Sequence, residues 1–105
     1  MVAKELIFAI LAKDIRKMHF SVRVINDCKA LGIKKVFEII EKMKENNSRF
    51  LHIFGLKSIA EIKEKLSERG IGENDLNELV IDEEFKRQLS NYEVIYNERK
   101  FALVN

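Results

Sequence analysis

The segment LGIKKVFEI at residues 31–39 is repeated as FGLKSIAEI at residues 54–62. Each copy has an apolar residue, Gly, an apolar residue and Lys in the same order, and each ends in Glu and Ile. The pattern predicts the end of one helix, a turn centred on glycine and the first turns of another helix. Two such helix-hairpin-helix units can pack as a pseudo-symmetric pair, so the repeat decides the expected fold.

A helix from Val22 to Leu31 is expected before the first turn. Ser21 is a favourable N-cap, and Gly32 supplies the left-handed residue that ends the helix. The apolar residues of this helix recur at a spacing of three and are expected to face the core: Val22, Ile25, Cys28 and Leu31.

Helical periodicity predicts three more helices, over Lys35–Glu45, Arg49–Ile53 and Lys57–Arg69. Gly70 ends the last of them, in which Glu61 and Lys65 are spaced for an i,i+4 pair. The residues expected to point inward are Val36, Ile39, Ile40 and Met43 in the first of these helices and Ile59, Ile62 and Leu66 in the last.

Weaker patterns occur near the two termini. Lys4–Met18 has helical spacing, although its dense apolar run also suits a buried strand, and we expect a helix. A helix after Asp75, through about Leu89, and a β-hairpin of Tyr92–Tyr96 and Arg99–Val104 are expected to follow. The expected fold is all-α, a compact helical bundle with two helix-hairpin-helix units, an extra N-terminal helix and a small C-terminal β-hairpin. The expected parts are a helical extension at 1–19, the helix-hairpin-helix domain at 20–72 and an acidic extension at 73–105.

Composition argues against several classes of protein. The longest apolar run, Leu6–Ala12, is far shorter than the roughly 20 residues of a membrane span, and no signal peptide is evident, so we expect a cytoplasmic protein without membrane contact. Cys28 is the single cysteine, and His19 and His52 lie far apart, which predicts neither a disulfide nor a metal site. Because no catalytic motif occurs either, we expect neither an enzyme nor a cofactor.

The net charge of +2 is unevenly distributed along the sequence. Residues 1–35 carry eight Lys or Arg against three Asp or Glu, residues 36–72 carry seven against six, and residues 73–105 carry four against eight. A basic surplus in the first third is typical of a surface that binds a polyanion, although solvated charge without a function produces similar distributions.

The two turns have the chemistry of a phosphate site. Glycine allows a ligand to approach the backbone closely, and the next helix begins with unpaired N–H groups at its positive dipole end. Lys34 in the first copy and Lys57 in the second add a cation, and Ser58 adds a hydroxyl. None of these groups reads a base, so the turns would position a duplex without specifying its sequence. The alternative is a tight turn between two helices with solvated lysines.

Residues 20–70 resemble the C-terminal domain of the alpha subunit of bacterial RNA polymerase. The resemblance rests on FSVRVINDCKALGIKKVFEII at residues 20–40 and FGLKSIAEIKEKLSERGI at residues 54–71. It implies binding to the minor groove of A/T-rich DNA and contacts with RNA polymerase, sigma factor or transcription regulators. The large assembly domain of the alpha subunit is not found before residue 20, so a stand-alone protein is expected.

The resemblance also implies roles for single residues. Arg23 matches the arginine that enters the minor groove, which suits the negative potential of narrow A/T tracts. The other matching positions are Asn26 and Lys29 on the same face, Gly55, Lys57 and Ser58 at the DNA backbone, and Glu61 as a candidate partner contact. Two residues depart from the family pattern: Cys28 replaces a leucine, and Asp27 adds a negative charge that should weaken phosphate binding.

The sequence therefore predicts a DNA-binding protein related to transcription. The alternative is a protein-interaction module that binds polymerase, sigma factor or a regulator and forms a homodimer. This alternative is motivated by the apolar faces of Lys4–Ile15 and Tyr92–Val104, which exceed what a small core needs.

Overall fold

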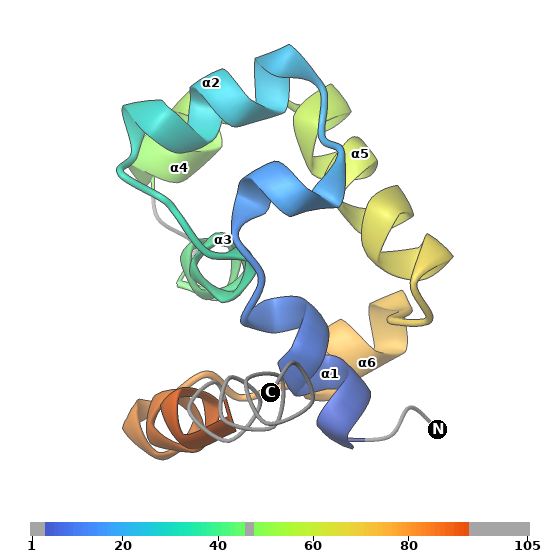
Figure 1. Ribbon diagram of the computed structural model, residues 1–105. Coiled ribbons are helices and arrows are strands. Elements are labelled where there is room, and N and C mark those ends of the chain that lie inside the picture. Colours follow the sequence, from blue (N-terminus) through green and yellow to red (C-terminus); the bar gives the residue numbers. More distant parts are fainter. Residues whose placement is uncertain (1–3, 46–47, 93–105) are drawn as a thin grey trace, which may run out of the picture.

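The computed structural model describes residues 4–45 and 48–92 (Figure 1). Helices make up the ordered elements of these residues, and Asp14 and Lys35 form an isolated β-bridge, so the all-α prediction is confirmed. The β-hairpin predicted over Tyr92–Tyr96 and Arg99–Val104 lies, apart from Tyr92, outside the described residues. The elements are α1 (Lys4–Leu11), the 3-10 helix η1 (Ile15–Met18), α2 (Val22–Ala30), α3 (Val36–Lys44), α4 (Ser48–Ile53), α5 (Leu56–Glu68), α6 (Glu73–Glu78) and a last helix at residues 83–92.

One hydrophobic core holds these elements together. Helix α2 packs against α5 and α3 packs against α4, so the first helix of each hairpin unit lies on the second helix of the other. This reciprocal packing agrees with the predicted pair of units. Fully buried core side chains, each worth roughly 1.5–3 kcal/mol, come from all parts of the fold and include Leu11, Met18, Val24, Ile39, Phe50, Ile62 and Leu66.

The helices of the repeat lie close to their predicted positions because their signals are local. Ser21 caps α2, and its side-chain oxygen accepts from the Val24 N–H at 3.3 Å. Helix α2 ends at Ala30 with Leu31 as its C-cap, Gly32 follows with a φ of +70°, and the Ile33 N–H donates to the Cys28 carbonyl at 2.9 Å. This Schellman turn requires a left-handed residue, and glycine adopts that conformation without strain. Gly70 ends α5 in the same way.

The single helix predicted over Lys4–Met18 is wrong. Residues 13–15 instead pair with residues 34–36: the Ile15 N–H donates to the Lys34 carbonyl and the Val36 N–H donates to the Lys13 carbonyl, both at 3.0 Å. Asp14 then caps η1 by accepting from the Arg16 N–H at 2.9 Å. The apolar residues keep a helical spacing from α1 into η1, although the helix is interrupted between them, because both elements bury apolar side chains in the same core.

The predicted inward face of α2 is also partly wrong. Val22 is 76% exposed, whereas Val24 and Cys28 are completely buried, and Ile25 and Leu31 lie at the edge of the core. The predicted spacing of three residues therefore chose a face of α2 that is rotated away from the core. The buried face is defined by Val24 and Cys28, which are four residues apart.

The helix predicted from Asp75 to about Leu89 is divided in two. Helix α6 ends at Glu78, and the next helix covers residues 83–92. Asp82 separates the two because its carboxylate accepts from the Phe85 N–H at 2.9 Å, as an N-cap does. The last helix packs on α1, with the ring centroids of Phe8 and Phe85 5.3 Å apart.

No helix within the described residues is both long and apolar enough to cross a membrane.

Candidate nucleic-acid interface

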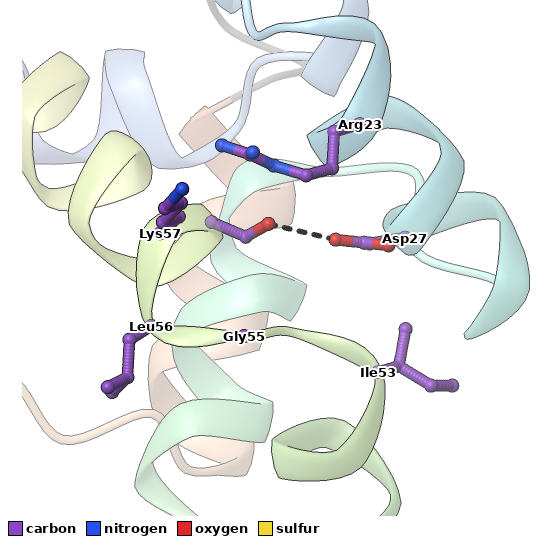
Figure 2. A pocket seen from close by; sticks show the side chains of 7 residues that line it. Arg23, Asp27, Ile53, Gly55, Leu56 and Lys57 are labelled. Atoms are coloured by element: carbon purple, nitrogen blue, oxygen red, sulfur yellow. Dashed lines mark hydrogen bonds between the residues drawn. The ribbon is translucent and has the colours of Figure 1, made fainter.

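Helix α2 and the start of α5 border an open hollow of about 390 Å³ (Figure 2). The α2 side of the hollow contributes Arg23 and Asp27. The second turn contributes its other lining residues, which are Ile53, Gly55, Leu56, Lys57 and Ser58. The hollow therefore brings together four residues predicted to bind DNA: Arg23, Gly55, Lys57 and Ser58.

The backbone at Gly55 opens the N-terminus of α5 toward this hollow. Gly55 is the N-cap, with a φ of −75° and a ψ of 174°, and it offers no side chain to cap the helix. Within residues 4–45 and 48–92, the amide groups of Leu56, Lys57 and Ser58 have no hydrogen-bond acceptor. These amides lie at the positive end of the helix dipole, where an anion is stabilised.

The absence of a side chain at Gly55 is not a requirement of the fold. Its φ is one that any residue adopts, and a Cβ added at this position would meet no atom within 4 Å. Gly32 differs, because its positive φ strains other residues. A glycine that the fold does not need leaves room for an external group to approach the backbone.

Arg23 and Lys57 supply the cations of the hollow, and both side chains are exposed. The Arg23 Nη2 lies 3.8 Å from the Glu61 Oε1, and the other Glu61 oxygen accepts from the Ser21 N–H at 2.7 Å. Glu61 thus makes its ion pair with Arg23 and caps α2. Partial burial raises the pKa of Glu61, but the hydrogen bonds from Ser21 and the charges of Arg23 and Lys65 lower it below its ordinary value.

Asp27 and Ser58 form a second polar tie between the two helices. The Ser58 hydroxyl donates to the Asp27 carboxylate at 3.0 Å, and Ser58 is only 2% exposed (Figure 2). A buried hydroxyl needs such a partner. Because the hydroxyl is engaged with Asp27, Ser58 presents its amide group to an anion, not its side chain.

The side chains that line the hollow carry a small net charge. Arg23 and Lys57 are positive and Asp27 is negative, and Glu61, which lies outside the lining, pairs with Arg23. The site can therefore orient an anion through its amides and guanidinium, but its own side chains provide little net attraction at long range.

The remaining predicted DNA-binding residues lie next to this hollow. Asn26 and Lys29 are exposed on α2 but do not line it. Sequence reasoning missed the apolar rim formed by Ile53 and by Leu56, which is 87% exposed. The repeat aligns Leu56 with Ile33, and two apolar residues at matching positions give no sign that they differ in exposure. In the structure, Ile33 is buried at 3% exposure.

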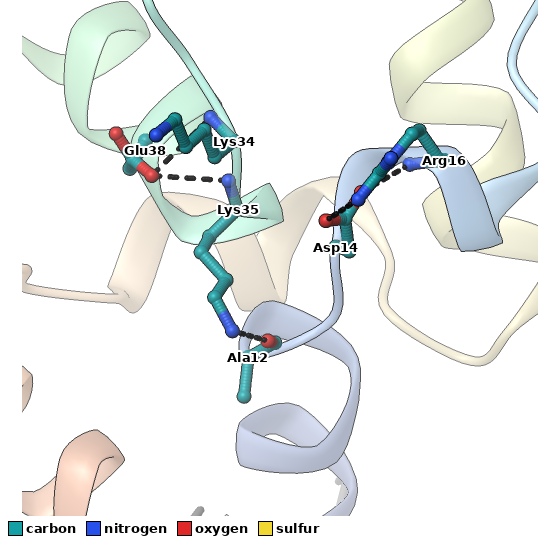
Figure 3. A network of polar contacts seen from close by, with 6 residues as sticks. All are labelled: Ala12, Asp14, Arg16, Lys34, Lys35 and Glu38. Atoms are coloured by element: carbon teal, nitrogen blue, oxygen red, sulfur yellow. Dashed lines mark hydrogen bonds and ion pairs between the residues drawn. The ribbon is translucent and has the colours of Figure 1, made fainter.

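The first turn, for which the sequence predicts the same phosphate chemistry, is closed. Both the Lys34 and the Lys35 N–H donate to the Glu38 carboxylate, at 3.3 and 3.0 Å (Figure 3). The next amide, of Val36, donates to the Lys13 carbonyl. The amides of residues 34–36 are thus occupied, and Lys34 adds only an exposed side chain.

Cys28 is buried beneath this turn, and burial raises the pKa of its thiol to about 12, with Asp27 and Glu38 adding to the effect. A thiol with this pKa stays protonated at neutral pH and packs as a small apolar side chain. In the part of the protein that the structure describes, no group of His, Cys, Asp or Glu side chains could hold a metal ion.

Comparison with known proteins agrees with the hairpin geometry. The family model of the C-terminal domain of the bacterial RNA polymerase alpha subunit matches residues 3–68, whereas no solved structure matches the sequence. Members of that family are non-catalytic domains of RNA polymerase that bind DNA and proteins. With well over half of its sequence matched, the protein belongs to the family of the C-terminal domain of the bacterial RNA polymerase alpha subunit.

Proposed function

We propose that this protein binds double-stranded, A/T-rich DNA through the hollow between α2 and α5. The observation that carries the proposal is the open N-terminus of α5, where three amides without an acceptor among residues 4–45 and 48–92 lie beside Gly55 and the exposed Lys57. A DNA phosphate fits this arrangement, because it accepts several N–H bonds and lies favourably at a helix N-terminus.

Arg23 is the residue that would enter the minor groove. Its guanidinium is exposed at the rim of the hollow, one helical turn before Asn26. A narrow A/T minor groove concentrates negative potential and attracts an inserted guanidinium. Lys29 is exposed further along the same helix and would meet the backbone of the duplex. On this proposal, the protein acts in the cytoplasm and at promoters, with polymerase, sigma factor or a regulator as further partners.

The test is a heteronuclear NMR titration of labelled protein with a short A/T-rich duplex and a G/C-rich duplex of equal length, each at two salt concentrations. The expected shifts concentrate at Arg23, Asn26 and residues 55–58, weaken with salt and are larger with the A/T-rich duplex. Arg23→Ala should reduce the difference between the duplexes. A titration without shifts at low salt would overturn DNA binding.

Lys57→Ala sharpens this test, because it removes one cation without touching the core. We expect weaker binding to every duplex and a slope of log K against log salt that is shallower by about one unit. The matched control is Lys65→Ala, which removes a half-buried lysine of the same helix that does not line the hollow. An equal change in both variants would place Lys57 away from the phosphates.

A second function, binding to a transcription protein, is favoured by one observation. Leu56 and Ile53 give the hollow an apolar rim that phosphates do not need. Leu56→Lys separates the two functions, because an added cation should strengthen binding to DNA but weaken binding to an apolar protein surface. Light scattering would show whether that surface belongs to a second copy of the protein, as a homodimer.

A further inference from the structure

We propose that a second basic surface, built where residues 13–17 meet residues 34–35, contacts the phosphates of the same DNA and adds to the small net attraction of the hollow. We name it the bridge patch, and its residues are Lys13, Arg16, Lys17, Lys34 and Lys35. The inference rests on the proposed function, because it assumes that DNA is the ligand of the hollow.

The hollow offers few cations to a duplex. Arg23 and Lys57 line it together with the carboxylate of Asp27, and Glu61, outside the lining, pairs with Arg23. Most of the affinity of a protein for duplex DNA at moderate salt comes from cations that displace counterions from the phosphates. Basic residues near the hollow would therefore add to the binding of a duplex.

A backbone contact gathers the residues of the bridge patch. The backbone pairing of residues 13–15 with residues 34–36 brings together two basic segments that are distant in the sequence (Figure 3). Among the described residues, the patch brings five basic residues together with two carboxylates, of Asp14 and Glu38, so the sum of these seven charges is positive. Glu38 accepts hydrogen bonds from the backbone amides of residues 34 and 35.

The basic side chains of the patch differ in how accessible they are to a phosphate. Lys17 and Lys34 are exposed and Lys13 is half-buried, whereas the Lys35 Nζ donates to the Ala12 carbonyl at 3.2 Å. Arg16 holds Asp14 through two side-chain hydrogen bonds, at 3.0 and 2.9 Å. These bonds, followed by the Arg16 N–H bond, hold the pKa of Asp14 well below its usual range. Lys13, Lys17 and Lys34 are therefore the residues to test.

The bridge patch lies close along the chain to the helix that carries Arg23. Only residues 19–21 separate η1 from α2, the helix that carries Arg23, and Ser21 is tied to α5 by its bond to Glu61. Figure 1 shows η1 between α1 and α2, beside the segment that leads into α3. Arg16 and Lys17 in η1 are thus only a few residues from the end of α2 that carries Arg23.

The experiment measures binding to an A/T-rich duplex as a function of salt for the unmodified protein and three variants. The patch variant combines Lys13→Gln, Lys17→Gln and Lys34→Gln. The control variant combines Lys42→Gln, Lys44→Gln and Lys63→Gln, which removes the same charge from α3 and α5, where Lys44 and Lys63 border α6 and Lys42 pairs with Glu45. Lys57→Ala reports on the hollow, and thermal unfolding verifies that each variant folds.

The patch variant should make the slope of log K against log salt shallower by about two to three units, while the control variant keeps the slope of the unmodified protein. Equal slopes for the patch and control variants would overturn the bridge patch. If Lys57→Ala had a shallower slope in the same series, the proposal that DNA binds at the hollow would still stand. Absence of DNA binding by the unmodified protein would overturn the proposed function and the bridge patch together.

Discussion

The turn at Gly32 and the turn at Gly55 come from matching sequences but differ in where the next helix begins. In the second copy the N-cap is Gly55 itself, whereas in the first copy it is Lys35, three residues after the matching glycine. Residues 33–35 consequently form an extended link, and their counterparts, residues 56–58, form the first turn of α5. Ile33 is therefore buried at 3% exposure, whereas Leu56 is 87% exposed.

The matching glutamates show what the shift does to function. Glu38 accepts from the amides at the start of its own helix and closes that end. Glu61 reaches across to Ser21 and caps α2 instead, which leaves the start of α5 open. The comparison teaches that one copy of a duplicated motif can become a structural joint while the other keeps its backbone free for a ligand.

The largest expected effect comes from placing serine at each glycine. Gly32→Ser should destabilise the protein by about 1–2 kcal/mol, because its φ of +70° strains a side chain. Gly55→Ser should raise stability by a few tenths of a kcal/mol, since serine is a slightly better N-cap than glycine. Urea unfolding measures both.

The same serine at position 55 should weaken DNA binding, because its hydroxyl would take up an amide of α5 and fill the approach to the backbone. Gly32→Ser is the control and should bind DNA as the unmodified protein does while folded. If Gly55→Ser binds DNA normally, the open helix end is not the phosphate site.

Glu38→Ala should cost about 1 kcal/mol of folding stability, because the amides of residues 34 and 35 lose their acceptor. Chemical denaturation against Glu45→Ala, an exposed glutamate at the other end of α3, isolates the capping effect. Equal loss in the two variants would mean that Glu38 does not close this turn.

Asp27→Asn should tighten DNA binding by about 0.5–1 kcal/mol, roughly two- to fivefold. Asparagine can still accept from the Ser58 hydroxyl, so the tie between α2 and α5 is kept while the negative charge is lost. Fluorescence anisotropy with a labelled duplex measures the change, and Asp27→Ala, which also removes the tie, is the companion variant. Unchanged affinity in Asp27→Asn would place the bound phosphate far from this carboxylate.

The smallest expected effect is the pH dependence of Glu61. Because its pKa in the folded protein lies below the ordinary value of 4.5, the carboxylate stabilises the fold above that pH, and the stabilisation is lost as the pH falls through the lower folded value. Glu61→Gln should thus lower stability by about 0.5 kcal/mol at pH 7, with a smaller difference at pH 3. A difference that does not change with pH would contradict a role for the charge.

Local signals predicted the parts of the fold that depend on local structure. Ser21, Gly32 and Gly70 mark helix ends through bonds to residues within five positions, and the helices between them were found within one or two residues. The break after α1 depends on pairing with residues 34–36, which no local pattern reveals. The helix predicted from Asp75 was likewise divided by a single cap at Asp82.

For the candidate site, too, the sequence predicted residues from local patterns but not the contacts between distant residues. Gly55 and Lys57 were predicted from the repeat and Arg23 from the resemblance, and the three line one hollow. The bonds from Ser58 to Asp27 and from Ser21 to Glu61 join residues that are 31 and 40 positions apart, and they decide which groups remain available. Spacing along one sequence holds no information on such pairs.

Because of the backbone bridge between residues 13–15 and 34–36, the first turn depends on a segment outside the two hairpin units, whereas the second turn does not. The second turn joins α4 to α5 and is tied to α2 by the bonds of Ser58 to Asp27 and of Ser21 to Glu61, so a graft that contains α2, α4, α5 and Ser21 would include both ties. The first turn depends on the Lys13 carbonyl and the Ile15 amide, which precede α2. Sequence divergence before residue 16 would therefore alter the joint while leaving the open helix end unchanged.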